Sequence, residues 1–217
     1  MLDRARDVAL ATFGLVASAP ALALAAIAIK LEDRGPILYR QTRVGHLGRD
    51  FELLKLRSMV VGAEAQGAGY AVNTGDPRIT RVGRMLRRLS LDELPQLWNV
   101  LRGDMSVVGP RPTLRYQVEQ YTPHQLRRLD VKPGLTGWAQ VHGRASLPWS
   151  ERIELDVWYV DHRSAWLDLK ILARTPRALF RGTYKGQTGG WTGTNNALNS
   201  PEPDSSGSSP RATRAPE

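Results

Sequence analysis

Two adjacent carboxylates, Asp92 and Glu93, stand in the segment RRLSLDELPQLWN, shortly after a pair of arginines. A carboxylate can attack phosphorus to form an acyl phosphate, and a second one beside it can move a proton or help to hold Mg²⁺. Both residues lie near an expected helix start, where the free amides and the helix dipole favour negative charge. The pair therefore indicates a helix cap, a phosphoryl-transfer centre, or both.

Cationic side chains that could hold a phosphate lie on both sides of this pair. Arg87 precedes it, and Arg111 follows it between two prolines, whose fixed φ angles restrain the arginine backbone. A restrained guanidinium suits bidentate contact with a phosphate. Lys55 and Arg57 add two cations upstream. Arginines, a helix N-terminus and paired carboxylates are together the parts of a site for phosphoryl transfer.

The helix after this motif could begin at either of two residues. Ser90 and Glu93 match a capping box, but Pro95 would then be the fifth helical residue, where its ring meets the preceding turn. With Asp92 as the cap, Pro95 falls inside the first turn, where no intrahelical hydrogen bond is lost. We therefore expect Asp92 to cap a helix that ends at Gly103.

The composition narrows the classes of partner. Lys and Arg number 30 against 21 Asp and Glu, and the isoelectric point is about 10.3. This balance favours a polyanion: nucleic acid, an anionic membrane surface or a phosphate-bearing substrate. The chain has no cysteine, which excludes disulfides and thiol chemistry, and its four histidines lack the spacing of metal ligands. Carboxylates beside the arginines would repel a nucleic-acid backbone, which makes that partner the least favoured.

Residues 8–29 form an uncharged apolar run that is long enough for a membrane helix. Three interpretations compete: a cleaved signal peptide, a simple spanning helix, and a re-entrant helix that enters and leaves on one face. Pro20 divides the run into two pieces, each about one leaflet deep, and Ser18 could satisfy a backbone group freed by the break. Basic residues flank both ends, which favours the re-entrant form with both ends in the cytoplasm.

The rest of the chain predicts a mixed α+β domain that is mostly helical with a small β-hairpin. Alternating apolar runs around a glycine-containing turn predict the hairpin over 37–58. The glycine-rich stretch 62–75 predicts a mobile loop. Helices are expected over 78–89, 113–129, 147–160 and 164–182. Pro176 should kink or split the last of these, whose apolar face would serve core packing or membrane contact.

Several motifs, taken in order, resemble one family. The run SLDELPQLWNVLRGDMSVVGPRP resembles the bacterial polyprenyl-phosphate sugar-1-phosphate transferases, the monotopic phosphoglycosyl transferases. Further segments match the same family: KLEDRGPILYRQTRVG, DPRITRVGR, KPGLTGWAQVHGR, ELDVWYV and WLDLKIL. The resemblance covers residues 4–182, and the chain length is that of small members that consist of the catalytic domain and its membrane helix.

The resemblance implies transfer of a sugar 1-phosphate from a UDP-sugar to a polyprenyl phosphate of the undecaprenyl type, with release of UMP. By motif position Asp92 is the nucleophile, which forms a covalent aspartyl intermediate and contributes to Mg²⁺ binding. Glu93 is its partner and the base for the lipid phosphate. Four more residues match phosphate-contacting arginines or a basic pair near them: Arg87, Arg111, Lys55 and Arg57.

The resemblance also implies an enzyme of the bacterial inner membrane whose catalytic domain faces the cytoplasm. We expect a re-entrant helix over 1–30, packed on a catalytic domain over 31–185, and a disordered tail over 186–217, which is rich in Gly, Ser and Pro. Expected partners are the UDP-sugar, the polyprenyl phosphate and the phospholipid membrane, and no nucleic acid is expected. The enzyme could also form a homodimer. The product would begin a surface polysaccharide or glycoconjugate. A non-catalytic basic membrane scaffold and a nucleic-acid-binding protein are the alternatives.

Overall fold

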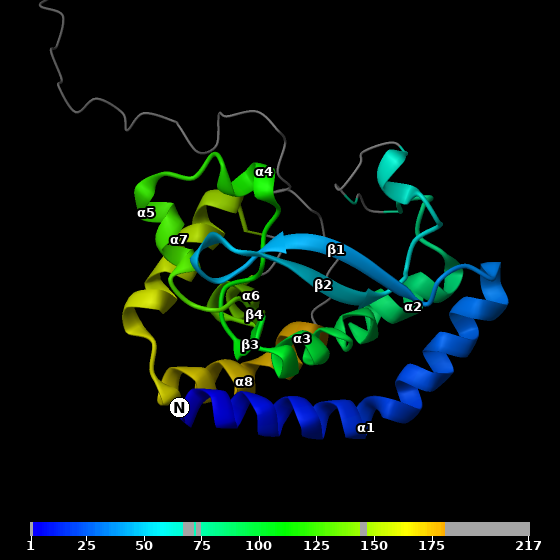
Figure 1. The fold of residues 1–217 in the computed structure, drawn as a ribbon, viewed down its shortest axis with the longest axis horizontal. Helices are drawn as coiled ribbons and strands as arrows, with labels where there is room; N and C mark the ends of the chain where they lie inside the picture. The colour runs from blue at the N-terminus through cyan, green and yellow to red at the C-terminus, as the bar shows by residue number, and fades with distance from the viewer. Residues whose placement is uncertain (1, 67–71, 73–74, 144–146, 181–217) are drawn as a thin grey trace, which may run out of the picture.

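The computed structural model describes residues 2–66, 72, 75–143 and 147–180. Helices surround one β-hairpin and one short pair of parallel strands (Figure 1). The predicted class, mostly helical with a small hairpin, is confirmed, whereas the sequence patterns did not indicate the parallel pair. Half of the predicted mobile loop and all of the predicted tail lie outside the described residues.

The first helix, α1 (Leu2–Asp33), runs beneath α3 and α8 and bends along its length (Figure 1). Its alanine- and leucine-rich sequence favours helix, and the helix continues through Pro20. The Ser18 hydroxyl donates to the Gly14 carbonyl at 2.6 Å, a back-bond of the kind that often bends helices. Asp3–Asp33 is long and apolar enough to cross a membrane, by length and composition.

The predicted hairpin is confirmed as β1 (Leu38–Val44) and β2 (Asp50–Leu56), which pair antiparallel along their whole length. The turn between them contains Leu47 and Gly48 at positive φ. The Val44 amide donates to the Thr113 carbonyl at 2.9 Å. This bond ties the end of β1 to the chain that follows Arg111.

The helix α3 (Gln96–Arg102) packs against β2 through the side chain of Asn99, which is fully buried. Its Oδ1 accepts from the Leu54 amide at 3.0 Å, and its Nδ2 donates to the Glu52 carbonyl at 2.6 Å. Two backbone groups of β2 thus bond to the buried side-chain amide of Asn99, and these bonds fix the position of β2 relative to α3. Gly103 ends the helix at φ 93°, as predicted.

The strands β3 (Ser106–Val108) and β4 (Gly134–Thr136) form the parallel pair. The backbone just after β3 lies so close to the start of β4 that a Cβ on Gly134 would be 2.1 Å from the Gly109 amide nitrogen. Asp7 of α1 accepts hydrogen bonds from a hydroxyl and a backbone amide of β3, both at 3.0 Å. The start of α1 is therefore fastened to the centre of the domain.

Six further helices complete the described chain: α2 (Arg81–Arg88), α4 (Arg115–Val118), α5 (Pro123–Leu126), α6 (Trp138–His142), α7 (Trp149–His162) and α8 (Ala165–Phe180). The predicted helices over 78–89, 147–160 and 164–182 correspond to α2, α7 and α8. The single helix predicted over 113–129 is wrong. The chain there forms α4, α5 and a 3₁₀ turn, because Thr122 caps a new helix at Pro123.

The main core lies between α1, β2, α3, β3, α7 and α8. α8 contributes Leu167 and Ile171 to it, so one face of this helix serves core packing. On its other face Trp166 is 74% exposed and Leu169 is 55% exposed. The helix continues through Pro176, so the prediction that this proline splits it is wrong.

Candidate active site

A groove of about 800 Å³ is lined by the hairpin, the chain around Asp92, the chain after Pro110, α6 and α7. Its size is that of a pocket for a small-molecule ligand. All six residues that the sequence assigned to substrate or metal line this groove: Asp92, Glu93, Arg87, Arg111, Lys55 and Arg57. Tertiary folding therefore brings together residues that are up to 56 positions apart in the chain (55 to 111).

The acidic pair lies in a 3₁₀ turn, Leu91–Glu93, that links α2 to α3. The prediction that Asp92 caps the following helix is wrong, because α3 begins at Gln96 with Pro95 in the capping position. Ser90 takes φ 55°, a left-handed conformation that redirects the chain as it leaves α2. The carboxylates are thus presented by a tight turn between two helices.

Two cations neutralise the carboxylate of Glu93. The Arg111 guanidinium pairs with both of its oxygens, and the Nη1–Oε2 contact measures 3.3 Å. Lys55 Nζ lies 3.5 Å from Oε1 of the same carboxylate. The Glu93 side chain is only 17% exposed, so these contacts are weakly screened. Glu93 is therefore an ion-paired carboxylate.

Asp92 is the buried member of the pair, with 8% of its surface exposed. Within the described residues, no hydrogen bond or salt bridge reaches its carboxylate. Burial raises the pKa of Asp92, the charge of Glu93 raises it further, and Lys55 and Arg87 oppose both effects. Burial also lowers the pKa of Lys55. Asp92 is thus a mostly buried carboxylate among cations, at the wall of a groove from which an electrophile or a cation can approach.

Arg87 and Arg57 occupy different places at the groove wall. Arg87 donates from Nε to the Ser58 hydroxyl at 2.7 Å and acts electrostatically on Asp92. Arg57 forms a bidentate ion pair with Asp33 and donates from Nε to the Pro36 carbonyl at 2.6 Å. Arg57 therefore fastens the end of α1 to the end of β2 as well as lining the groove.

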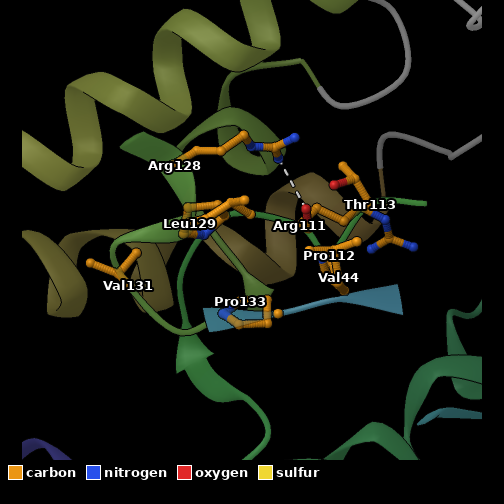
Figure 2. Close-up of a pocket in the computed structure, with 10 residues that line it drawn as sticks. Val44, Arg111, Pro112, Thr113, Arg128, Leu129, Val131 and Pro133 are labelled. Atoms are coloured by element: carbon orange, nitrogen blue, oxygen red, sulfur yellow. Dashed lines mark hydrogen bonds between the residues drawn. The ribbon is translucent and has the colours of Figure 1, made fainter. Parts of the chain in front are cut away.

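A buried ion pair supports the chain at Arg111. Arg128 donates to the Arg111 carbonyl at 3.0 Å, as Figure 2 shows, and pairs with Asp156 of α7. It also donates to the Tyr121 hydroxyl at 2.7 Å. A cavity of about 10 Å³, with Arg111 and Arg128 in its lining, lies beside this contact (Figure 2). Burial raises the pKa of Asp156 to about 6, against the opposing charge of Arg128.

Arg128, Asp156 and Gln140 line the groove but were not found by reasoning from the sequence. Asp156 and Gln140 stand inside two of the motifs that carry the family resemblance, ELDVWYV and KPGLTGWAQVHGR, which is the signal that could have selected them. No local signal marks Arg128, because its neighbour Arg127 has the same residue type and lies on the surface in an exposed ion pair with Asp161.

An acidic pair with one neutralised and one buried carboxylate, set among arginines, is a setting in which phosphate-bearing substrates can bind. The sequence profile of the family described as bacterial sugar transferase matches residues 1–182. The chain belongs to this family, and the family predicted from the motifs is confirmed.

Similar proteins carry names that agree with this assignment. An uncharacterized sugar transferase EpsL of Bacillus subtilis is 44% identical over 82% of this chain and 86% of its own length. A UDP-glucose:undecaprenyl-phosphate glucose-1-phosphate transferase of Caulobacter vibrioides is 48% identical over 81% of this chain and 68% of its own. A UDP-N-acetylgalactosamine-undecaprenyl-phosphate N-acetylgalactosaminephosphotransferase of Aeromonas hydrophila is 42% identical, and the match covers only 44% of that protein.

Proposed function

We propose that this enzyme transfers a sugar 1-phosphate from a UDP-sugar to an undecaprenyl-type polyprenyl phosphate through a covalent intermediate on Asp92. The products are UMP and a polyprenyl diphosphate sugar. One observation carries the proposal: a buried carboxylate without an ion-pair partner among the described residues stands beside an ion-paired one, in a groove lined by Lys55, Arg87 and Arg111. The names of the similar proteins support the donor and acceptor classes.

In the first step an Asp92 oxygen forms a bond to the β-phosphorus of the UDP-sugar. The bond from that phosphorus to the oxygen shared with the α-phosphate breaks, and UMP leaves with that oxygen. Repulsion between the carboxylate and the diphosphate opposes the approach, and the cations of the groove offset it. Because Asp92 is largely buried, its interactions with these cations are screened less than those of a surface carboxylate.

In the second step an oxygen of the lipid phosphate attacks the phosphorus attached to Asp92, and the Asp92 oxygen is released. Glu93 accepts the proton when the lipid phosphate arrives as a monoanion. The ion pairs with Arg111 and Lys55 weaken Glu93 as a proton acceptor. Substrate phosphates compete for the same two cations, so their binding frees the carboxylate for this task.

The residues fit a Mg²⁺ site that is completed by the substrate. Mg²⁺ is commonly held by one or two carboxylates together with substrate phosphates, rather than by a cage of protein ligands. Within the described residues no group of three or more acidic or histidine ligands gathers, and Asp92 is the member of the acidic pair that has no salt bridge. Asp92 would hold the ion, which would neutralise charge on the diphosphate.

We further propose that α1 is re-entrant and that both its ends face the cytoplasm at the bacterial inner membrane. Asp7 binds β3 near the start of α1, and Asp33 binds Arg57 at its end, so both ends are fastened to one domain. Large apolar side chains between them face outward: Phe13, Val16, Leu24 and Leu31 are 69–80% exposed. The helix is not broken at Pro20, but this proline removes the amide that would bond to the Val16 carbonyl, which makes bending there easier.

The test measures UMP release by the purified protein with a UDP-sugar and Mg²⁺ but without a lipid acceptor. We expect a burst of about one UMP per chain and a chain mass increased by one sugar phosphate. Asp92→Asn should abolish both signals, and Glu93→Gln should slow the later transfer to the lipid more than the burst. Asp161→Asn, an exposed acidic residue on α7, is the matched control and should keep the burst. A full burst in Asp92→Asn would refute the proposed nucleophile.

A further inference from the structure

The groove has an apolar part next to the end of α1. Arg57, which lines the groove, pairs with Asp33 at this end of the helix, and its backbone amide donates to the Ile37 carbonyl at 2.8 Å. In Figure 1 this end of α1 lies beside α2 and the start of β1. Five partly or fully exposed apolar residues of the groove lie in the two segments that meet at Arg57, and we call them the apolar arm: Pro36, Leu38, Met59, Val60 and Val61.

Three side chains of the apolar arm are open to solvent. Leu38 is 39% exposed, Val60 is 37% exposed and Val61 is 62% exposed. Leu31 of α1, two residues before Asp33, is 80% exposed. Exposed apolar residues that gather at a groove are typical of a site that binds an apolar ligand or a membrane.

A buried ion pair fixes the loop that carries the two valines. Arg78 is 6% exposed and pairs with Asp76 at 2.6 Å. It donates to the carbonyls of Ala63 and Gln66 at 2.9 and 2.8 Å, and its own carbonyl accepts from the Val60 amide at 2.9 Å. The loop therefore holds its valines at the groove instead of burying them in the core, which fits a surface that a ligand covers.

The apolar arm adjoins cations of the groove that suit phosphate binding. Ser58, at the start of the loop with the valines, accepts from Arg87 Nε at 2.7 Å, and Arg87 acts electrostatically on Asp92. Lys55 lies opposite the residue after Leu38 in the hairpin register. A ligand with an anionic head and a hydrocarbon chain can therefore place its head on these cations and the start of its chain on the apolar arm.

These two adjoining surfaces favour a polyprenyl phosphate. A UDP-sugar has no hydrocarbon chain that could cover the apolar arm. In a polyprenyl phosphate the first isoprene unit is bonded directly to a phosphate oxygen, so head and chain would contact neighbouring surfaces. In a phospholipid, glycerol separates the phosphate from the acyl chains, which makes that ligand a poorer fit. An acceptor held in a bilayer would also arrive from the side of α1, where the apolar arm lies.

We propose that the apolar arm binds the first isoprene units of the polyprenyl phosphate and thereby directs its phosphate toward Asp92. This inference rests on the proposed function and adds the part of the site that holds the acceptor chain. Leu38, Val60 and Val61 are then binding residues that take no part in bond making. The UDP-sugar does not contact the apolar arm, so the two half-reactions should respond differently to changes there.

The experiment measures transfer from the sugar-phosphate form of the enzyme to undecaprenyl phosphate in detergent micelles, for wild type, Leu38→Ser and Val61→Ser. Leu126→Ser in α5 is the matched control, because Leu126 is 40% exposed and is not among the groove residues. We expect the KM for the acceptor to rise about fivefold in the two arm variants, since each loses part of an apolar contact, and to stay unchanged in the control. The KM for the UDP-sugar in the UMP burst should not change in any of these proteins.

A second measurement tests the chain of the acceptor directly. Geranyl phosphate, a short isoprenoid phosphate, should inhibit transfer by wild type about tenfold more strongly than inorganic phosphate, and the arm variants should reduce that difference. Val61 is 62% exposed and lies in a loop, so Val61→Ser should keep the unfolding temperature of wild type and carry the test even if Leu38→Ser does not fold.

Each other outcome has a definite meaning. An unchanged acceptor KM in both arm variants would overturn the inference, as would equal inhibition of wild type by geranyl phosphate and inorganic phosphate. A raised KM for the UDP-sugar with an unchanged acceptor KM would overturn it and assign the apolar arm to the donor. Loss of transfer in vesicles alone, with normal values in micelles, would overturn it and assign the arm to the bilayer surface. Absence of a UMP burst in wild type would instead refute the proposed function.

Discussion

Replacing Arg128 with methionine tests whether a buried ion pair holds the active-site loop. The Arg128 side chain is 3% exposed and contacts three groups: the Asp156 carboxylate, the Tyr121 hydroxyl at 2.7 Å and the Arg111 carbonyl at 3.0 Å. Methionine has a similar apolar stem but no donor. The variant therefore leaves Asp156 buried without its cation and the Arg111 carbonyl without its donor.

The magnitude follows from burial. Removing one partner of a buried ion pair destabilises a protein by about 3–5 kcal/mol, because the remaining charge is left uncompensated. Burial already raises the pKa of Asp156 to about 6 in the presence of Arg128. Without Arg128 that pKa should rise further, so Asp156 would become protonated near neutral pH. The loss of stability in Arg128→Met should therefore lie at the lower end of this range, because a protonated Asp156 leaves no uncompensated charge.

The pH dependence has a definite sign. A carboxyl whose pKa is higher in the folded than in the unfolded state adds stability below its unfolded pKa of about 3.9, and this is lost as pH rises through the folded pKa. In wild type the loss is complete slightly above pH 6. In Arg128→Met it continues to higher pH. The difference in stability between the two proteins should therefore be largest above pH 7 and shrink below pH 6.

The assay is urea-induced unfolding in detergent between pH 5 and 8. Arg127→Met is the matched control: its ion pair with Asp161 has side chains 44% and 38% exposed, so its loss should change the free energy of unfolding by at most about 1 kcal/mol. The double variant Arg128→Met with Asp156→Leu should recover much of the stability, since it removes both charges. Equal effects of the two arginine variants would refute the reasoning.

Two more predictions concern the elements around the acidic pair. Gly83→Ala should destabilise the protein and lower the rate of UMP release, because its Cβ would lie 2.0 Å from the Ser58 carbonyl oxygen and push α2, which carries Arg87, away from the groove. Thermal unfolding measures the first effect and the burst assay the second. An unchanged melting temperature would contradict the close packing at Gly83. Lys55→Arg should move the alkaline limit of activity to higher pH, because burial lowers the pKa of Lys55 while arginine stays charged. The measurement is the pH profile of kcat/KM. A profile that does not move would show that activity does not need the charge at this position.

Local patterns in the sequence were sufficient for several elements. Alternation around a glycine turn predicted the hairpin, and apolar spacing predicted most of the longer helices. The same kind of reasoning failed over 113–129, where local capping by Thr122 interrupts a pattern that looked continuous. It also misplaced the cap of α3, because the positive φ of Ser90 is a property of the connection between two packed helices.

The sequence by itself determined the chemical types present: an acidic pair, an arginine between two prolines, an apolar segment that contains a proline, and a family-wide order of motifs. Only the tertiary structure decided which charges meet. Glu93 pairs with Arg111 and Lys55, whereas Arg57 pairs with Asp33. Of the adjacent residues Arg127 and Arg128, it is Arg128 that is buried, in an ion pair with Asp156. Periodicity and fixed φ angles act over a few residues, whereas ion-pair choice and burial depend on packing between segments distant in the chain.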